Sequence, residues 1–291
     1  MKLSLSTHLL VYGELDSVGR RAIAEAGCSE SEVWLAEPHV RWRSAFAMTE
    51  LRKKLEDSGS RPGTVHLPFY PSVSGLLDRG EKWSVIDPDS NRRKIALDGM
   101  AEGFHAAATL GARAGVLHLG WPGDAWGKAQ LHWAEEAVDK LLPIAKKCGV
   151  QLLLENIISD GTRAKNLVRL LDKVDPDGHA GICLDLGHAH VEGNILEELS
   201  DSLPRLAHLH VHDNDGCHDQ HAAPGQGTIP WRELLQQLNS ISYQGSGALE
   251  LRDFSKGALS PAEVIQKEMG HVRQFHRHWA NENLLTPSID E

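Results

Sequence analysis

Short apolar runs recur along the chain, and between them lie segments in which apolar residues repeat at helical spacing. The short runs predict strands at residues 1–6, 31–37, 64–69, 114–120, 151–156, 180–185, 206–213 and 246–251. Parallel strands need long crossover connections, whereas antiparallel strands can be joined by tight turns. Strands that alternate with helical segments therefore favour a parallel sheet with helices outside it.

Capping residues mark the ends of the predicted helices. Apolar positions at helical spacing run from Arg92 to Gly111 and from Lys128 to Gly149, and each segment ends at a glycine suited to a left-handed C-cap. A third helix is expected after Ser260, because the sequence Ser-Pro-Ala-Glu combines an N-cap, a first-turn proline and a capping glutamate.

Eight strands alternating with eight helical segments predict an α/β protein with a single (β/α)8 TIM barrel, covering residues 1–291 as one domain. A doubly wound open sheet is the alternative, but no glycine-rich phosphate-binding turn follows the first strand. Residues 70–90 and 212–229 are expected to be long loops on the face where barrel active sites lie.

Composition narrows the class of protein. Thirty Lys and Arg against 40 Asp and Glu give a net charge of −10, which makes nucleic acid an unlikely partner and argues against anionic membranes. No run of 18 apolar residues predicts a membrane span. The four cysteines form no Cys-x-x-Cys pair, so free thiols and a cytoplasmic location are expected. Nothing in the sequence specifies an oligomeric state.

Ionisable side chains lie at the ends of six predicted strands. They are His66, His118, Glu155, Asp185, His210 and Glu250, and Glu37 closes a seventh strand. The C-terminal ends of parallel barrel strands converge, so these groups should share a small volume. Because buried acids and imidazoles are costly without a compensating cation, a divalent metal ion is predicted. A nitrogen and oxygen donor set suits Mn, Zn, Co, Fe or Mg.

Further donors follow in the chain. His188 lies one turn beyond Asp185, and the imidazoles at 208, 210 and 212 alternate, which places them on one face of a strand. Asp219 and His221 lie in the long segment after that strand. Trp121, just after the fourth strand, either forms an apolar wall for a sugar ring or packs in the core.

The strand-end motifs resemble those of the xylose isomerase-like barrel superfamily, which includes sugar isomerases, ketose 3-epimerases and endonuclease IV abasic-site nucleases. The resemblance extends from His66 to Glu250 and rests on the order of five motifs: VLHLG at 116–120, LLLEN at 152–156, CLDLGHAH at 183–190, HVHDND at 210–215 followed by DQH at 219–221, and ALEL at 248–251.

The resemblance implies one to three metal ions. By the epimerase pattern, a single ion is held by Glu155, Asp185, Glu250 and either His210 or His212, of which His210 is the preferred interpretation. By the endonuclease IV pattern, three ions share nine ligands, and this chain has a candidate for each: His66, His118, Glu155, Asp185, His188, His210, Asp219, His221 and Glu250.

The favoured hypothesis is a metal-dependent isomerase or epimerase of a small sugar, sugar phosphate or polyol. Glu155 and Glu250 would act as an acid–base pair around the ion, and His188, His212 and Trp121 would contact the substrate. The alternative is a multi-metal phosphodiesterase, acting on abasic sites or on a small phosphoester. A barrel that only binds sugar is a third possibility, disfavoured by the intact pair of glutamates.

Overall fold

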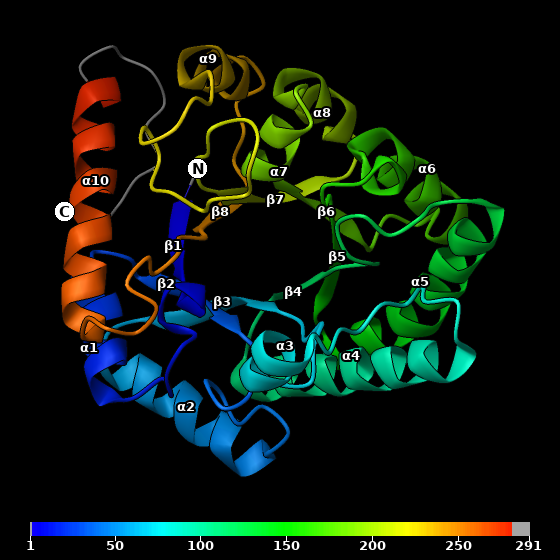
Figure 1. Ribbon diagram of the computed structural model, residues 1–291, viewed down its shortest axis with the longest axis horizontal. Helices are drawn as coiled ribbons and strands as arrows, with labels where there is room; N and C mark the ends of the chain where they lie inside the picture. The colour runs from blue at the N-terminus through cyan, green and yellow to red at the C-terminus, as the bar shows by residue number, and fades with distance from the viewer. Residues whose placement is uncertain (1, 281–291) are drawn as a thin grey trace.

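The computed structural model describes residues 2–280, and its eight strands form a closed parallel barrel in which each strand pairs with the next and the last with the first (Figure 1). The strands are β1 Lys2–Ser6, β2 Glu30–Trp34, β3 Arg61–His66, β4 Ala114–Leu117, β5 Gln151–Glu155, β6 Gly181–Asp185, β7 Leu206–Val211 and β8 Ser246–Leu249. This confirms the predicted (β/α)8 TIM barrel and excludes the open sheet. The single domain over 1–291 stays a prediction, because Met1 and residues 281–291 lie outside the described residues.

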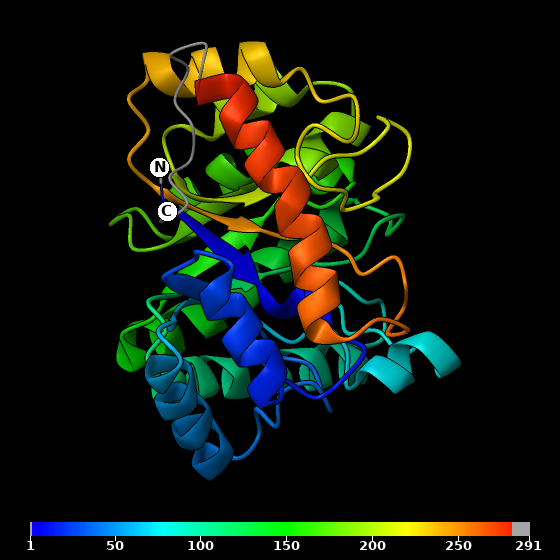
Figure 2. The same cartoon turned by 90° about the vertical axis from the view of Figure 1, so that its left-hand side faces the viewer.

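Helices surround the barrel, and α10 lies beside α1 to complete the ring (Figures 1 and 2). The helices are α1 Ser17–Glu25, α2 Ala45–Asp57, α3 Val73–Arg79, α4 Ser90–Leu110, α5 Lys128–Cys148, α6 Ala164–Val174, α7 Leu186–Val191, α8 Ile195–Ser202, α9 Trp231–Ser240 and α10 Pro261–Ala280, with short 3-10 helices η1 Thr7–Leu10 and η2 Asp160–Thr162. The expected glycine caps are present, since Gly111 and Gly149 have left-handed backbones with φ of 86° and 67°.

Two sequence predictions about local structure are wrong. Residues 70–90 are expected to be a loop but contain α3. Ser72 is the N-cap of this helix, and its hydroxyl accepts a hydrogen bond from the Gly75 N–H. The sequence predicts the third strand at 64–69, but β3 runs over Arg61–His66, because Pro62 pairs with β2 despite its poor strand propensity. In both cases tertiary packing outweighs local propensity.

Strand alternation decides which side chains enter the barrel. On β5, Leu152 and Leu154 join the main core beneath the helices, whereas Leu153 belongs to a separate small cluster with Val116 and Cys183. Successive side chains on a strand point to opposite faces, so Glu155 lies on the same interior face as Leu153. The same alternation directs the polar side chains of β3, β6 and β7 that could bind a metal into the barrel interior.

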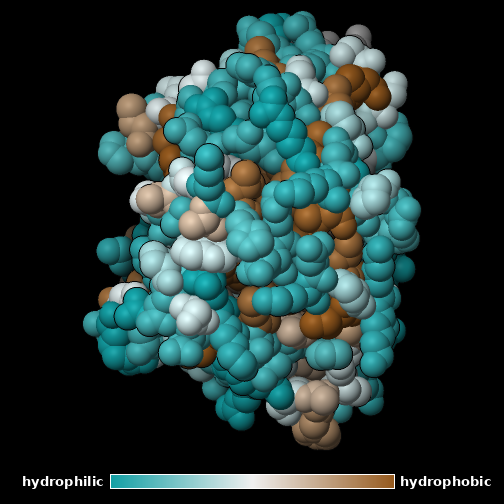
Figure 3. Space-filling view, turned by 90° about the vertical axis from the view of Figure 1, so that its right-hand side faces the viewer, coloured by the Kyte–Doolittle hydropathy of each residue, from teal (hydrophilic) through white to brown (hydrophobic). Residues whose placement is uncertain are grey.

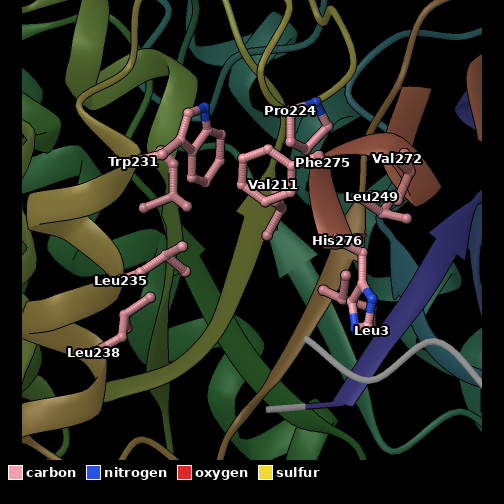
Figure 4. A pocket seen from close by; sticks show the side chains of 11 residues that line it. Leu3, Val211, Pro224, Trp231, Leu235, Leu238, Leu249, Val272, Phe275 and His276 are labelled. Carbon is pink, nitrogen blue, oxygen red and sulfur yellow. The ribbon is translucent and has the colours of Figure 1, made fainter. Parts of the chain in front are cut away.

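The outer surface is polar where helices meet solvent. The face formed around α5 and α6 is largely hydrophilic, with apolar side chains showing only between polar ones (Figure 3). On the other side of the molecule, apolar residues of α9, α10 and the barrel wall face one small cavity, among them Val211, Trp231 and Phe275 (Figure 4). None of the described helices has the length and apolar character required to cross a bilayer.

The loop after β7 is organised by one buried carboxylate. Asp213 accepts hydrogen bonds from the backbone N–H groups of Gly225 and Ile229, at 2.8 and 3.2 Å, and from the Trp231 indole N–H at 2.8 Å. Its backbone also pairs with Ala222 in an antiparallel bridge. A single side chain therefore holds both ends of the segment that contains residues 219–221.

We expect Asp213→Ala to destabilise the fold by about 3 kcal/mol, because the Ile229 and Trp231 N–H groups, which are buried, and the Gly225 N–H lose their acceptor. Chemical denaturation of the two proteins measures the difference. Asp215→Ala is the matched control, since Asp215 is a neighbouring but exposed acceptor and its loss should cost less than about 1 kcal/mol. Equal unfolding midpoints for both variants would contradict the organising role of Asp213.

Candidate metal centre

The C-terminal ends of the strands open into a cavity of about 330 Å³. Its polar side is formed by side chains from the strand ends and from the segments that follow them: His8, His118, Glu155, His188, Asp219, His221 and Glu250. Its other side is apolar and includes Val11, Tyr12, Trp34, Phe69, Tyr70, Leu76, Leu77 and Trp121. The cavity thus brings a cluster of metal-binding side-chain types against an apolar wall.

A central group of four donors comes from four consecutive strands. Glu155, Asp185, His210 and Glu250 are all buried, and their ligand atoms lie within 4.8 Å of one another. His210 Nδ1 lies 2.6 Å from Glu250 Oε2, 3.1 Å from Glu155 Oε1 and 3.7 Å from Asp185 Oδ2. One imidazole nitrogen therefore faces three carboxylates, an arrangement suited to a divalent ion among them.

A second group combines His66, His118 and Glu155. The Nε2 atoms of His66 and His118 lie 3.2 Å apart. Glu155 Oε2 lies 2.8 Å from His118 Nε2 and 3.4 Å from His66 Nε2. Glu155 belongs to both groups, with Oε1 facing His210 and Oε2 facing the two other histidines. Its carboxylate can therefore bridge two ions.

A third group contains His188, Asp219 and His221. Asp219 Oδ2 lies 3.3 Å from His188 Nε2 and 3.1 Å from His221 Nε2. His188 comes from the turn of α7 that follows β6, whereas the other two come from the loop after β7. The backbone of His221 is left-handed, with φ of 52°, a conformation that non-glycine residues seldom adopt.

Three of these histidines have their outer nitrogen fixed by a backbone carbonyl. The Nδ1 atoms of His66, His188 and His221 lie 3.0, 2.8 and 2.9 Å from the carbonyl oxygens of Leu67, Asn156 and Glu250. A hydrogen bond of this kind places the proton on Nδ1 and leaves Nε2 free as a ligand, as is typical of metal-binding histidines. The imidazoles are thus oriented before any ion binds.

The electrostatics of the site suit cation binding. Burial alone would raise the pKa of Glu155, but the charges of His210 and His118 hold it well below its usual range. Burial likewise opposes ionisation of Glu250, yet His210 lowers its pKa to about 2. Burial lowers the pKa of His221, but Asp219 raises it to about 9. Glu155 and Glu250 are therefore ionised at neutral pH, and the positive charge of the neighbouring histidines, which a bound cation could replace, stabilises them.

Unpartnered atoms in the same place support the fit to metal ions. Asp219 Oδ1 is buried and accepts no hydrogen bond, and the buried Glu250 Oε2 has a single close donor, His210 Nδ1 at 2.6 Å. A buried anionic oxygen without a donor is costly, and a cation bound by these groups would remove that cost. The donors are carboxylate oxygens and imidazole nitrogens, which suit several divalent metals and do not select one.

All nine predicted ligands fall into the three groups. His210, on β7, faces the central carboxylates. His212, directly after β7, places its Nε2 2.9 Å from Asp185 Oδ2, and its ring stacks on that of His221 with centroids 4.1 Å apart. His212 is fully buried and does not line the cavity, so it supports Asp185 instead of making the expected substrate contact. Trp121 does line the cavity, and its indole N–H donates to the Trp83 carbonyl oxygen at 2.9 Å.

Two residues of the site escaped the sequence analysis. His8, just after β1, lines the cavity, and its ligand atom lies within 4.8 Å of those of His221 and Glu250. The second missed residue is Glu32, the carboxylate of β2 that faces the barrel interior. Glu37 is expected at the end of this strand, but β2 ends at Trp34, and Glu37 does not line the cavity. Side chains alternate between the two faces along the first strand, and extending this alternation to position 8 would place His8 on the interior face.

Several known proteins are similar to this chain at low sequence identity. An uncharacterised protein of Methanocaldococcus jannaschii is 26% identical over 196 residues, a match covering 62% of this chain and 65% of that protein. Fructoselysine 3-epimerase of Shigella flexneri is 26% identical over 248 residues, covering 79% of this chain and 83% of the relative. A probable endonuclease 4 of Methanoculleus marisnigri is 26% identical over 245 residues, covering 76% of this chain and 82% of the relative.

Solved structures share the fold at low identity. A D-tagatose 3-epimerase-like protein superposes with a TM-score of 0.74 and 20% identity, covering 96% of this chain and 100% of the other. The IolI protein with a bound zinc atom gives a TM-score of 0.72 and 18% identity, and the match covers 94% of this chain and 98% of the IolI chain. The family model that describes the xylose isomerase-like TIM barrel matches residues 20–275. The chain therefore belongs to the xylose isomerase-like TIM barrel family.

Proposed function

We propose that this protein is a multi-metal phosphoesterase that hydrolyses a small phosphate ester at the mouth of the barrel. The observation that carries the proposal is the position of Glu155, whose two carboxylate oxygens face two different donor groups. A glutamate shared in this way is suited to hold two ions side by side. It is less suited to act as the free acid or base that a single-metal isomerase requires.

Bound divalent ions would offset the charge of the phosphate oxygens and lower the pKa of a water molecule. The chain itself orients the site: Asn156 accepts from the Asp185 N–H at 2.6 Å and donates to the Asp185 carbonyl at 3.0 Å. Arg252 lines the cavity two residues after Glu250 and can contact an outer phosphate oxygen. In hydrolysis the water oxygen bonds to phosphorus, the ester P–O bond breaks, and the departing oxygen takes a proton.

The shape and charge of the cavity favour a small substrate over duplex DNA. Arg252 is the one arginine or lysine among the described residues that line it, and the chain carries a net charge of −10. DNA binding requires many phosphate contacts from lysine and arginine. Lys82 lies nearby but covers the Trp121 ring, 4.4 Å from its centroid. The apolar wall suits the leaving group of a small ester.

A metal-dependent isomerase or epimerase of a sugar or polyol is the second candidate. The specific observation in its favour is the apolar wall of the same cavity, together with the single arginine and lack of lysine among its described lining residues, because sugar rings pack well on aromatic side chains. In this reaction Glu155 and Glu250, which both contact His210 Nδ1, would exchange a proton with a substrate carbon. Only the central group would be needed.

We expect the purified protein to bind up to three divalent ions per chain, since three donor groups are present. His66→Ala should remove one of them, because it takes a donor from the second group. Metal analysis after dialysis against zinc measures the stoichiometry. His132→Ala, which changes an exposed histidine on α5, is the control and should keep the full count. Unchanged metal content in His66→Ala would contradict the second site.

Turnover should distinguish the two reactions. We expect release of p-nitrophenol from p-nitrophenyl phosphate or its bis ester, with a loss of about 10²-fold or more in His66→Ala. Isomerase activity, measured by uptake of solvent deuterium into ketoses, should survive the same substitution, because the central group stays intact. Deuterium uptake without phosphate ester cleavage would overturn the proposal and favour the second candidate.

Glu155→Gln and Glu250→Gln should abolish either activity with the fold intact, because each variant removes an anionic ligand of the central group. Circular dichroism and the thermal midpoint monitor the fold, and the two assays above monitor turnover. Wild-type activity in Glu250→Gln would show that the central group is not the reactive site.

Removal of metal should lower the thermal stability as well as the activity. Ligands that bind only the native state stabilise it, so a chelator should lower Tm, and excess zinc or manganese should restore it. Differential scanning calorimetry of the chelated and reloaded protein measures the shift. A Tm that is insensitive to both treatments would contradict metal binding at the buried carboxylates.

A further inference from the structure

The barrel interior beneath the metal centre holds a carboxylate that the proposed reaction does not use. Glu32, on β2, has no exposed surface, and it faces β7 although the two strands are not neighbours in the barrel. Its Oε2 atom accepts a hydrogen bond from the Thr64 hydroxyl at 2.9 Å. Its Oε1 atom has no hydrogen-bond partner. A buried glutamate in such a place needs a reason.

Glu32 meets the outer nitrogen of the central histidine. His210 Nε2 lies 3.3 Å from Glu32 Oε2, while Nδ1 of the same ring faces the three carboxylates of the central group. His208 Nε2 lies 3.5 Å from the same glutamate oxygen, and Nδ1 of that ring is held by the Ser246 hydroxyl at 2.8 Å. Glu32 therefore lies between the two strand-7 imidazoles below the centre.

His210 differs from the other histidines in how it is held. His66, His188 and His221 present Nε2 to their groups and keep Nδ1 on a backbone carbonyl. His210 presents Nδ1 instead. A neutral imidazole carries one proton, so a ring that binds a cation through Nδ1 must carry its proton on Nε2. The acceptor facing that proton is the Glu32 carboxylate.

We propose that Glu32 is the positioning residue of the central ion: it accepts the Nε2–H of His210, selects that tautomer and aims Nδ1 at the carboxylates. The proposal rests on the metal centre of the proposed function, and it holds for either candidate reaction. A carboxylate acceptor also increases the basicity of the coordinating nitrogen more than a neutral carbonyl does. Glu32 itself would not touch substrate.

Glu32→Gln tests this role with little change of volume. Its amide can turn an N–H toward His210 Nε2, which favours a proton on Nδ1 and so removes that atom as a ligand. We expect the affinity for one ion to fall by about 10- to 100-fold, as is usual when a partner of a metal-binding histidine is lost. The ions of the other two groups should keep their affinities.

The measurement is a zinc titration of the chelated full-length protein in competition with a chromophoric chelator, followed by the absorption spectrum of the cobalt-loaded form. Glu30→Gln is the matched control, because Glu30 is a buried glutamate on the same strand that pairs with Arg113 at 2.8 Å, away from the centre. The control should lower the stability of the metal-free protein and leave zinc affinity and the cobalt spectrum unchanged.

Thr64→Val provides a second variant should Glu32→Gln fail to fold. It removes the hydroxyl that holds Glu32 Oε2 and keeps the side-chain volume, so zinc affinity of the central site should fall by a smaller factor, under about 10-fold. Wild-type affinity and an unchanged cobalt spectrum in the folded Glu32 or Thr64 variant would overturn the positioning role. Absence of zinc binding by the wild-type protein would instead overturn the proposed function itself.

Discussion

The desolvation of carboxylates at the mouth of the barrel is the constraint on which the rest of the centre depends. Glu155, Asp185 and Glu250 enter the site from three strands and are almost completely removed from water. Their charge requires positive charge close by, and imidazoles supply only part of it. The hydrogen bonds that orient each histidine, and the amide of Asn156 on Asp185, keep the donors directed at the places where cations would lie.

Much of this could be predicted from sequence, because a strand has only two faces. Once the apolar residues Leu152 and Leu154 are assigned to the side covered by helices, Glu155 must face the interior. The same reasoning places His66, Asp185 and His210 together when the barrel closes. The sequence does not separate His210 from His212, because both lie on that face. In the structure His210 Nδ1 contacts Glu155 and Glu250, whereas His212 Nε2 contacts Asp185.

The features that escaped prediction depend on contacts remote in the chain. The run 31–37 contains two glutamates, and only the closure of the barrel brings Glu32 against β7. Helix α3 is too short for its sequence to specify it without the packing around it. His8 follows a strand whose polar face gives no sign that Trp34 and His221 will lie beside it. The local sequence pattern determines which face of a strand a side chain lies on, whereas its contact partners are determined by the assembled fold.

Two of the nine donors, Asp219 and His221, belong to a loop and not to a strand, and Asp213 anchors that loop at both ends. One connection consequently supplies two of the three donors of the third group, separately from the scaffold that holds the other donors. If an ion binds to the third group as proposed, its binding and the ordering of this segment would promote each other. Under the proposed function, a change confined to the β7–α9 connection would remove two donors of the third group and leave the barrel strands unchanged.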